Sequence, residues 1–318
     1  MTLHLVTGSD DNYAAGVLVL IASAAFHTPD LRVTVLDNGI SAANRARIDA
    51  LGARLGVPLT RIEIGAEAFA DLPVRRGHLT RSTYLRLLIP QLLPEAERVL
   101  YMDCDMVVTD DLSPLAALPL GDAMVAAVPD PSPDAAELAS TGVARGAYVN
   151  AGLLVMNLPV WRAEGVAERC LALLSDPARP LMSEDQSALN IAAAGRILPL
   201  PARFNVYADP AAYPGAAAVP ADPAVIHYVV GHKPWAARGV MMGEVWHHHA
   251  GLIAAQMPPL PAASLGSRLS AFNRQRKLWM GLAAGRGKYR TQRQVRAAMR
   301  RVAARYLAQV AGRPVSGR

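Results

Sequence analysis

Two carboxylates stand two residues apart in the stretch "RVLYMDCDMVVTD", residues 98–110. Asp103 and Asp105 interrupt apolar residues, with Val99–Met102 before them and Met106–Val108 after them. Two acids that are buried together repel each other, so something must neutralise their charge. A divalent cation does this directly, because Mg²⁺ and Mn²⁺ prefer carboxylate oxygen. A turn whose acids pair with Arg or Lys explains the same residues without a ligand.

Three kinds of protein function use such a pair of aspartates, and the pair alone does not distinguish among them. In phosphoryl transfer of the haloacid-dehalogenase type, one Asp is the nucleophile and the other the acid–base, and a lysine contacts the phosphate. Lys233 is the one lysine of this chain that precedes the basic tail. In transfer from a nucleotide-sugar, the pair holds a metal that neutralises the diphosphate leaving group. A catalytically weak protein that binds sugar nucleotides or glycans needs the same groups for binding alone.

Strand-like and helix-like segments alternate along the chain, which predicts an α/β domain with a largely parallel sheet. In open sheets of this kind, ligands bind at the carboxyl ends of the strands. Three polar clusters follow predicted strands: 10–12, the Asp103–Asp105 pair, and the residues from His227 onward. The predicted strands are 3–7, 31–39, 58–65, 98–102, 122–130, 147–158 and 224–235, and the predicted helices start near Tyr13 or cover 41–56, 80–94 and 183–195.

Composition excludes several classes of protein. The chain has 318 residues, of which 52% are hydrophobic, enough for one large core. Its two cysteines, Cys104 and Cys170, argue against a disulfide framework and for a reducing compartment. No basic region followed by a long apolar run opens the chain, and the apolar stretch 14–26 is too short to span a bilayer. We therefore expect a cytoplasmic protein.

Charge is divided unevenly along the chain. Of the 32 basic residues, 14 follow residue 244 with no acid among them, which leaves 18 basic and 26 acidic residues in 1–244. We expect a catalytic domain over 1–250, a Pro-rich linker over 251–261 and a basic tail over 262–318. In 290–310 the apolar residues recur at helical spacing, which predicts an amphipathic basic helix. These residues are Val295, Met299, Val302, Tyr306 and Val310.

Two interpretations of this tail stay open. Its apolar stripe packs on the protein itself, or it lies on anionic lipid of the inner leaflet as a peripheral anchor. Nucleic acid is not expected as a partner, because a helix with such a stripe favours lipid. His247–His249 precede the tail, and we expect them at the surface, since three consecutive histidines cannot all face one ion.

Five motifs occur in a fixed order. They are "VTGSDDNYAAG", "STYLRLLIPQLLPEAERVLYMDCDMVV", "YVNAGLLVMNLPVWR", "SEDQSALN" and "VIHYVVGHKPW". Together they resemble glycosyltransferase family 8, the glycogenin-like enzymes and bacterial lipopolysaccharide or lipooligosaccharide galactosyl- and glucosyltransferases, over residues 3–250. The resemblance implies a single nucleotide-binding domain of the GT-A type, with a mixed, largely parallel sheet. It also implies metal-dependent transfer of galactose or glucose from a UDP-sugar, with retention of configuration, to a glycan or glycolipid in surface polysaccharide synthesis.

The resemblance assigns roles to individual residues. Asp103, Asp105 and His227 would hold Mn²⁺ or Mg²⁺, while Asp185 and Gln186 would orient and stabilise the donor sugar at the reacting carbon. One departure is visible, because Val230 stands where the family usually has glycine and Gly231 follows it. The residues assigned to the nucleotide and donor are Gly8, Asp10, Asn12, Tyr13, Arg86, Cys104, Asn150, Ala151, Gly231 and Lys233.

Each of these residues also has an explanation without function. Asp10 and Asn12 fit the caps of an ordinary loop, and His227 fits a core histidine. Arg86 fits a helix-face arginine whose charge reaches solvent, although its apolar neighbours favour an inward, paired side chain. Ser183 and Gln186 have the spacing of a capping box, which would explain Gln186 entirely.

Overall fold

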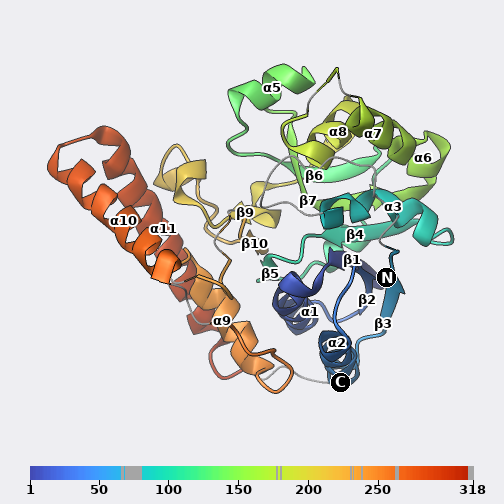
Figure 1. Cartoon of the computed structure of the whole chain (residues 1–318), viewed down its shortest axis with the longest axis horizontal. Coiled ribbons are helices and arrows are strands. Elements are labelled where there is room, and N and C mark those ends of the chain that lie inside the picture. Colours follow the sequence, from blue (N-terminus) through green and yellow to red (C-terminus); the bar gives the residue numbers. More distant parts are fainter. Residues whose placement is uncertain are drawn as a thin grey trace.

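A seven-stranded sheet forms the centre of the molecule (Figure 1). The computed structural model describes residues 1–65, 68, 81–176, 178–179, 181–229, 231, 233–237, 239–261 and 265–313. The expected helix start at residue 80, Val230 and the tail residues 262–264 and 314–318 therefore lie outside the described residues. Across the sheet the strands are β3 Leu59–Glu63, β2 Leu31–Asp37, β1 Leu3–Ser9, β4 Arg98–Met102, β7 Val149–Asn157, β6 Val125–Pro129 and β8 Ile197–Pro199.

The sheet is mixed and largely parallel, as the sequence predicts. β1 pairs in parallel with β2 and β4, β2 with β3, and β6 with β8. β7 runs antiparallel to both β4 and β6. The carboxyl ends of β1 and β4 consequently meet at one edge, where the loop of residues 103–105 begins.

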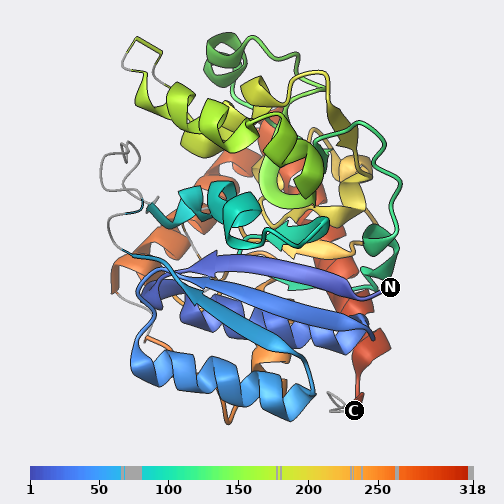
Figure 2. The ribbon, with the colours of Figure 1, turned by 90° about the vertical axis from the view of Figure 1, so that its right-hand side faces the viewer.

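Helices cover both faces of the sheet, and the strands are apolar on both sides for this reason. In β4, Leu100 and Met102 belong to one core while Val99 and Tyr101 belong to the other. Figure 2 shows α1 and α2 side by side beneath β1–β3. The helices are α1 Ala14–His27, α2 Ala42–Leu55, α3 Leu85–Leu92, α4 Ser113–Ala116, α5 Ala135–Thr141, α6 Leu158–Ala163, α7 Val166–Ser175, α8 Glu184–Ala192, α9 Gly243–Leu252, α10 Leu265–Ala283 and α11 Gly287–Val310.

Capping residues and glycines in the sequence explain some of the helix ends, whereas other predicted boundaries differ from those in the structure. α2 begins after Ser41, whose hydroxyl accepts from the Asn44 N–H, and ends at Gly56, whose φ of +65° suits glycine. The helix expected over 80–94 is instead a 3₁₀ segment, Arg81–Tyr84, followed by α3. Residues 224–235 are expected to be a strand that runs into a Gly-containing loop; the strand is β10, Val225–His227, and the described residues after it are not part of a strand.

A second, three-stranded sheet explains why the acid pair lies where it does. β5, Met106–Val108, pairs antiparallel with β10, which pairs in parallel with β9, Val206–Tyr207. Residues 103–105 therefore connect a strand of the large sheet to a strand of the small one. The pairing of His227 with Met106 holds that histidine beside the acids.

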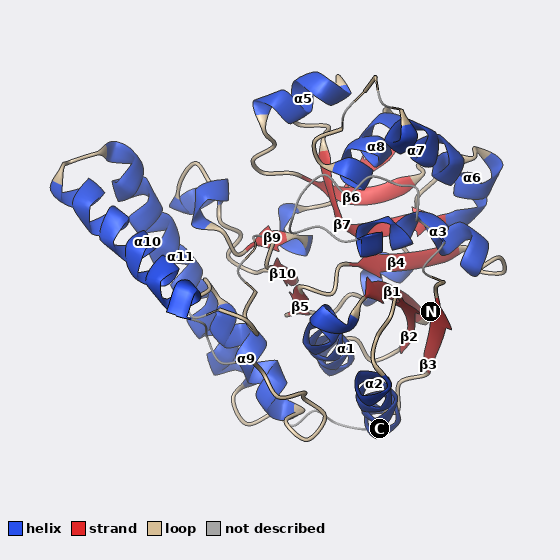
Figure 3. Ribbon diagram, viewed as in Figure 1, coloured by secondary structure: helices blue, strands red, loops and turns tan. Residues whose placement is uncertain are grey.

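The tail forms an antiparallel helical hairpin, α10 and α11, which Figure 3 shows extending from α9. The apolar stripe of α11 is buried in the same core as α1 and β1, so it packs on the protein and is not free to meet lipid. α10 differs, because four of its large apolar side chains are exposed: Leu269, Phe272, Trp279 and Met280. No described helix is both long enough and apolar enough to cross a membrane.

A buried polar contact fastens α11 to the domain. The Tyr306 hydroxyl lies 2.8 Å from His27 Nε2 and 2.6 Å from His249 Nε2. The expectation that His247–His249 lie at the surface is wrong for His249, which is fully buried; Phe26 packs edge-on against it. Burial lowers the pKa of His249 to about 3 and that of His27 to about 4, so both are neutral at pH 7.

We predict that acid weakens the folded state through His249. Between pH 6.5 and about pH 4 the unfolded chain binds a proton at this residue and the folded chain does not. The free energy of unfolding should therefore fall by up to about 1.4 kcal/mol per pH unit for this group. Urea unfolding at pH 7 and pH 5 measures it, and His249→Gln should show a smaller fall than the wild type. Burial also lowers the pKa of the more exposed neighbour His247, but by less, so His247→Gln should reduce the fall less than His249→Gln does. An equal fall in all three proteins would contradict a role for His249.

Candidate active site

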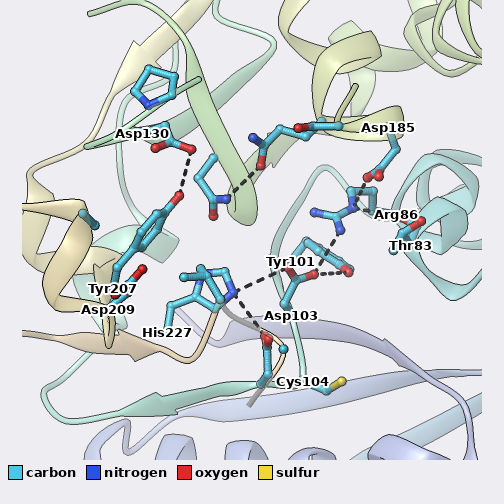
Figure 4. A pocket seen from close by; sticks show the side chains of 18 of the residues that line it. Thr83, Arg86, Tyr101, Asp103, Cys104, Asp130, Asp185, Tyr207, Asp209 and His227 are labelled. Carbon is cyan, nitrogen blue, oxygen red and sulfur yellow. Dashed lines mark hydrogen bonds and ion pairs between the residues drawn. The ribbon is translucent and has the colours of Figure 1, made fainter. Parts of the chain in front are cut away.

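A cavity of about 570 Å³ opens at the carboxyl edge of the large sheet. Figure 4 shows side chains of the cavity converging from the loop after β4 (Asp103), from the end of β10 (His227) and from the start of α8 (Asp185). Asn12 is exposed and does not line it, and both backbone groups of buried Ala151 are bonded within the protein. The other predicted site residues line it: Gly8, Asp10, Tyr13, Arg86, Asp103, Cys104, Asp105, Asn150, Asp185, Gln186, His227, Gly231 and Lys233.

Asp103, Asp105 and His227 come together as one cluster. Their nearest ligand atoms all lie within 4.8 Å of one another. His227 Nε2 is 3.2 Å from Asp105 Oδ1 and 3.9 Å from Asp103 Oδ2. Asp105 Oδ1 is buried and accepts no hydrogen bond from any described residue, which leaves one acceptor atom to be satisfied by something else.

Backbone N–H groups of β7 determine which nitrogen of His227 faces the acids. The Gly152 N–H donates to Asn150 Oδ1, so this amide oxygen also accepts from Asn205 Nδ2 at 2.7 Å. Asn205 Oδ1 therefore faces His227 Nδ1, at 2.9 Å, and requires a proton there. His227 Nε2 can then present a lone pair toward the acids, as a metal ligand must.

Gly152 makes room for this cluster. A Cβ at this position would lie 2.5 Å from His227 Cε1 and 2.9 Å from Asp103 Oδ2, closer than real Cβ atoms approach. The glycine in the strand is therefore explained by close approach.

Two cations balance the acids. Lys233 Nζ donates to Asp105 Oδ2 at 2.5 Å and to the Tyr228 carbonyl at 2.6 Å. Burial alone would raise the pKa of the Asp105 carboxyl, but the Lys233 ammonium beside it holds this pKa well below its usual range. Asp103 pairs instead with Arg86 Nη2 at 3.1 Å and accepts from the Tyr101 hydroxyl at 2.7 Å.

Arg86 is buried, so the interpretation as a solvated helix-face arginine is wrong. Its Nε lies 2.8 Å from Asp185 Oδ2, and its Nη1 donates to the Ala151 carbonyl. Its guanidinium carbon lies 4.7 Å from the centre of the Tyr101 ring, a cation–π contact. Burial raises the pKa of Asp185 to about 6, and Arg86 offsets part of this rise. Arg86 thus joins the acid pair to the start of α8.

Gln186 does not belong to a capping box. The Ser183 side chain makes no cap hydrogen bond and donates instead to Glu137 Oε2 at 3.0 Å. Gln186 Oε1 accepts from Asn150 Nδ2 at 2.8 Å and from the Ala151 N–H at 3.1 Å. These two bonds use both lone pairs of the amide oxygen, which argues against this atom as a nucleophile.

The backbone before Asp185 adopts an unusual conformation. Glu184 has a φ of +47°, a region that costs a non-glycine residue about 1–2 kcal/mol. Tyr84 donates to its buried carboxylate at 2.9 Å. Such strain is concentrated at functional sites, and here it immediately precedes Asp185 and Gln186.

Tyr13 also lines the cavity and meets Trp235 edge to face, with ring centres 5.5 Å apart. Asp10 accepts from the Asn12 N–H at 3.0 Å and caps the 3₁₀ turn Asp11–Tyr13, so the predicted capping role is confirmed. Tyr13 and Asp10 both line the cavity, which leaves an aromatic face and a carboxylate available to a ligand there.

Sequence reasoning missed several polar residues of this site. Asn205 lies beside β9 in a stretch with no motif and no periodicity, and its importance appears only from its contact with His227. Tyr101 and Tyr148 fit as apolar strand residues in the pattern, although their hydroxyls bond Asp103 and Glu137. A tyrosine directly before the acid pair is the one local signal that could have been used.

The cluster fits a divalent cation of the Mn²⁺ or Mg²⁺ class. It offers two carboxylates, an imidazole nitrogen in the correct tautomer and a buried acceptor atom without a partner. Oxygen ligands suit both ions, and the nitrogen favours Mn²⁺.

We predict that Gly152→Ala weakens Mn²⁺ binding at least about tenfold, because the new methyl group displaces His227 or Asp103. Isothermal titration with Mn²⁺ measures the affinity. Gly146→Ala is the control, since a Cβ at Gly146 meets nothing within 4 Å. Equal affinity in the Gly152 variant and the control would contradict the proposed ion position.

Comparison with known proteins agrees with this geometry. The chain is 27% identical over 250 residues to General stress protein A of Bacillus subtilis (strain 168), covering 73% of this chain and 87% of that protein. It is 26% identical over 254 residues to the Lipopolysaccharide 1,3-galactosyltransferase of Salmonella typhimurium, covering 74% of each. Among solved structures, the galactosyltransferase LgtC, in complex with donor and acceptor sugar analogues, superposes with a TM-score of 0.69. That match is 30% identical and covers 84% of this chain and 99% of the other.

A family model matches the chain as well. Residues 4–239 match the model of the family described as Glycosyl transferase family 8, which is most of the chain. The α/β fold of the LgtC structure and the Asp-Asp-His cluster are in keeping with that match. The chain therefore belongs to glycosyl transferase family 8.

Proposed function

We propose that this protein is a metal-dependent, retaining hexosyltransferase that moves galactose or glucose from a UDP-sugar to a glycan or glycolipid. The observation that carries the proposal is the cluster of Asp103, Asp105 and His227 beside two buried cations, Lys233 and Arg86. Relatives named as lipopolysaccharide galactosyl- and glucosyltransferases support surface polysaccharide synthesis as the setting.

Asp103, Asp105 and His227 would hold the metal, which when bound supplies positive charge against the diphosphate leaving group. Lys233 would exchange its contact with Asp105 for a phosphate oxygen, which adds a second positive charge at the same place. Asp10 and Tyr13 would bind the ribose and base. A Cβ at Gly8 would lie 2.7 Å from Leu85 Cδ1, so this glycine makes room for Leu85, whereas the space beside Gly231 is open and would let a ligand approach its backbone.

Asp185 and Gln186 would orient the donor sugar. Arg86 holds the Asp185 carboxylate, which would accept from sugar hydroxyls and stabilise positive charge at the anomeric carbon. Since Gln186 Oε1 has both lone pairs engaged, a covalent intermediate on this residue is disfavoured. We infer same-face displacement through an oxocarbenium-like transition state, in which the leaving phosphate accepts the proton of the acceptor.

A panel of UDP-sugars with Mn²⁺, scored for hydrolysis, tests the proposal. We expect UDP-galactose or UDP-glucose to be hydrolysed, and chelation of the metal to abolish the activity. Asp103→Asn should lower kcat at least about 100-fold, because it removes a metal ligand and a partner of Arg86. Glu168→Gln, an exposed acid on α7, is the control and should keep wild-type activity.

Release of inorganic phosphate from small phosphoesters, without hydrolysis of any UDP-sugar, would contradict the proposal. That result would favour the dehalogenase-type chemistry that uses the same Asp pair.

We further propose that the tail meets an anionic membrane at the inner leaflet, through α10 rather than α11. Leu269, Phe272, Trp279 and Met280 are 53–67% exposed and their spacing places them on one side of the helix. Arg276 and Lys277 are exposed beside them. Arg276 falls within this apolar side and Lys277 at its border, and an exposed apolar face that carries basic side chains fits the interface of anionic lipid, where a glycolipid acceptor would be found.

Sedimentation with vesicles containing anionic lipid tests this contact. Phe272→Ser combined with Trp279→Ser should reduce the bound fraction severalfold while UDP-sugar hydrolysis stays unchanged. Leu260→Ser, another exposed apolar residue outside α10, should bind as the wild type does. Binding of the double variant at the wild-type level would contradict the role of α10.

A further inference from the structure

Glu137 is a buried carboxylate that none of the proposed roles uses. It lies on α5, is 2% exposed and borders the cavity. Its Oε1 accepts from the Tyr148 hydroxyl at 2.7 Å and from Ser187, and its Oε2 accepts from Ser183 at 3.0 Å. All three partners are neutral hydroxyls that donate, so the side chain serves only as an acceptor. A buried acid without a cation among these partners is costly and calls for a reason.

Hydrogen bonds run in one direction from the acid cluster to this carboxylate. His227 Nδ1 donates to Asn205, Asn205 to Asn150, and Asn150 to Gln186 Oε1. Gln186 Nε2 then donates to the Tyr148 oxygen at 3.1 Å, and Tyr148 donates to Glu137. The backbone N–H groups of Ala151 and Gly152 fix the orientation of the two middle amides.

Such an arrangement concentrates charge at Gln186. Tyr148 is a stronger acceptor because its proton is held by a carboxylate, and the Gln186 amide that donates to it is polarised in turn. Polarisation of an amide in this direction makes its oxygen more negative. That charge would lie where the proposed oxocarbenium-like transition state develops positive charge.

We propose that Glu137 is a positioning residue that acts through Tyr148 to orient and polarise the Gln186 amide. The inference rests on the proposed function, because it assigns Gln186 to the donor sugar. Its buried charge strengthens stabilisation of the transition state and has little effect on binding of the ground state. It should therefore affect kcat more than KM.

Glu137→Gln removes the negative charge of this side chain and keeps its shape. The new amide can keep an oxygen toward Tyr148 and Ser187 and turn its nitrogen toward Ser183, so the contacts persist while the charge is lost. We expect kcat for UDP-hexose turnover to fall at least about tenfold with KM for the donor little changed. Tyr148→Phe should give a similar fall in kcat, because it removes the hydroxyl that links Glu137 to the Gln186 amide. Glu164→Gln is the control, since this carboxylate pairs with Arg196 at the surface.

Two further measurements test whether Glu137 affects kcat through the Gln186 amide. In a Gln186→Ala background, Glu137→Gln should lower kcat no further. The ¹⁵N side-chain amide signal of Gln186, identified by its loss in Gln186→Ala, should shift in Glu137→Gln and in Tyr148→Phe. It should not shift in Glu164→Gln. Assays are run well below the melting temperature of each variant.

The outcomes are distinct. Wild-type kcat in Glu137→Gln, or an equal further loss in the Gln186→Ala background, would overturn the role of Glu137. A lowered melting temperature with unchanged kcat would likewise show that Glu137 serves stability alone. Absence of turnover in the wild type with every UDP-hexose would sink the proposed function instead, and the amide signal would still decide whether Glu137 acts on Gln186.

Discussion

Repulsion between two carboxylates is the constraint on which the site depends. Asp103 and Asp105 are separated by one residue at the point where β4 of the large sheet leads into β5 of the small one. Burying both without compensation would cost several kcal/mol. In the structure Lys233 pairs with Asp105 and Arg86 pairs with Asp103, and each cation is held by further contacts. Asp105 is buried and Asp103 is partly buried, and each is balanced by a buried cation; this arrangement suits the metal ion and phosphates of the proposed ligand.

The second constraint is the direction of the hydrogen bonds around the site, from donor to acceptor. Backbone N–H groups of β7 can only donate, and this decides how Asn150, Asn205 and Gln186 must face. Through them it also decides the tautomer of His227. A regular strand thus determines the chemistry of side chains that come from three other segments of the chain. The same strand needs Gly152, because a larger residue would occupy the space of the cluster.

Much of this was predictable from the sequence. The alternation of strands and helices gives the mixed sheet, and the apolar runs on each side of the acid pair place it at a strand end. Apolar neighbours of Arg86 favour an inward side chain, as found. The capping-box spacing at Ser183 was misleading, since its hydroxyl and the Gln186 amide have stronger partners on other segments. Asn205 and Glu137 have no motif, because their roles arise only from tertiary contacts.

The structure of the tail was also only partly predictable from the sequence, because it depends on tertiary contacts. Periodicity in 290–310 establishes an amphipathic helix but not what covers its apolar side. The covering segments include short turns, Pro210–Ala212 and Ala216–Ala218, which have no periodic signal. His249 is buried for a related reason, because Tyr306 and Phe26, both distant in sequence, enclose it. The charge asymmetry does not tell which of the two tail helices has an exposed apolar face, and that face is on α10.

The most direct test of the account is the affinity of UDP with and without Mn²⁺. If Asp103, Asp105 and His227 hold an ion whose charge offsets that of the diphosphate, isothermal titration should show UDP binding at least about tenfold tighter with Mn²⁺ present, a gain of about 1.4 kcal/mol or more. His227→Ala should remove most of that gain. Equal UDP affinity with and without the metal would contradict the central claim that this cluster is a metal site for a nucleotide-sugar.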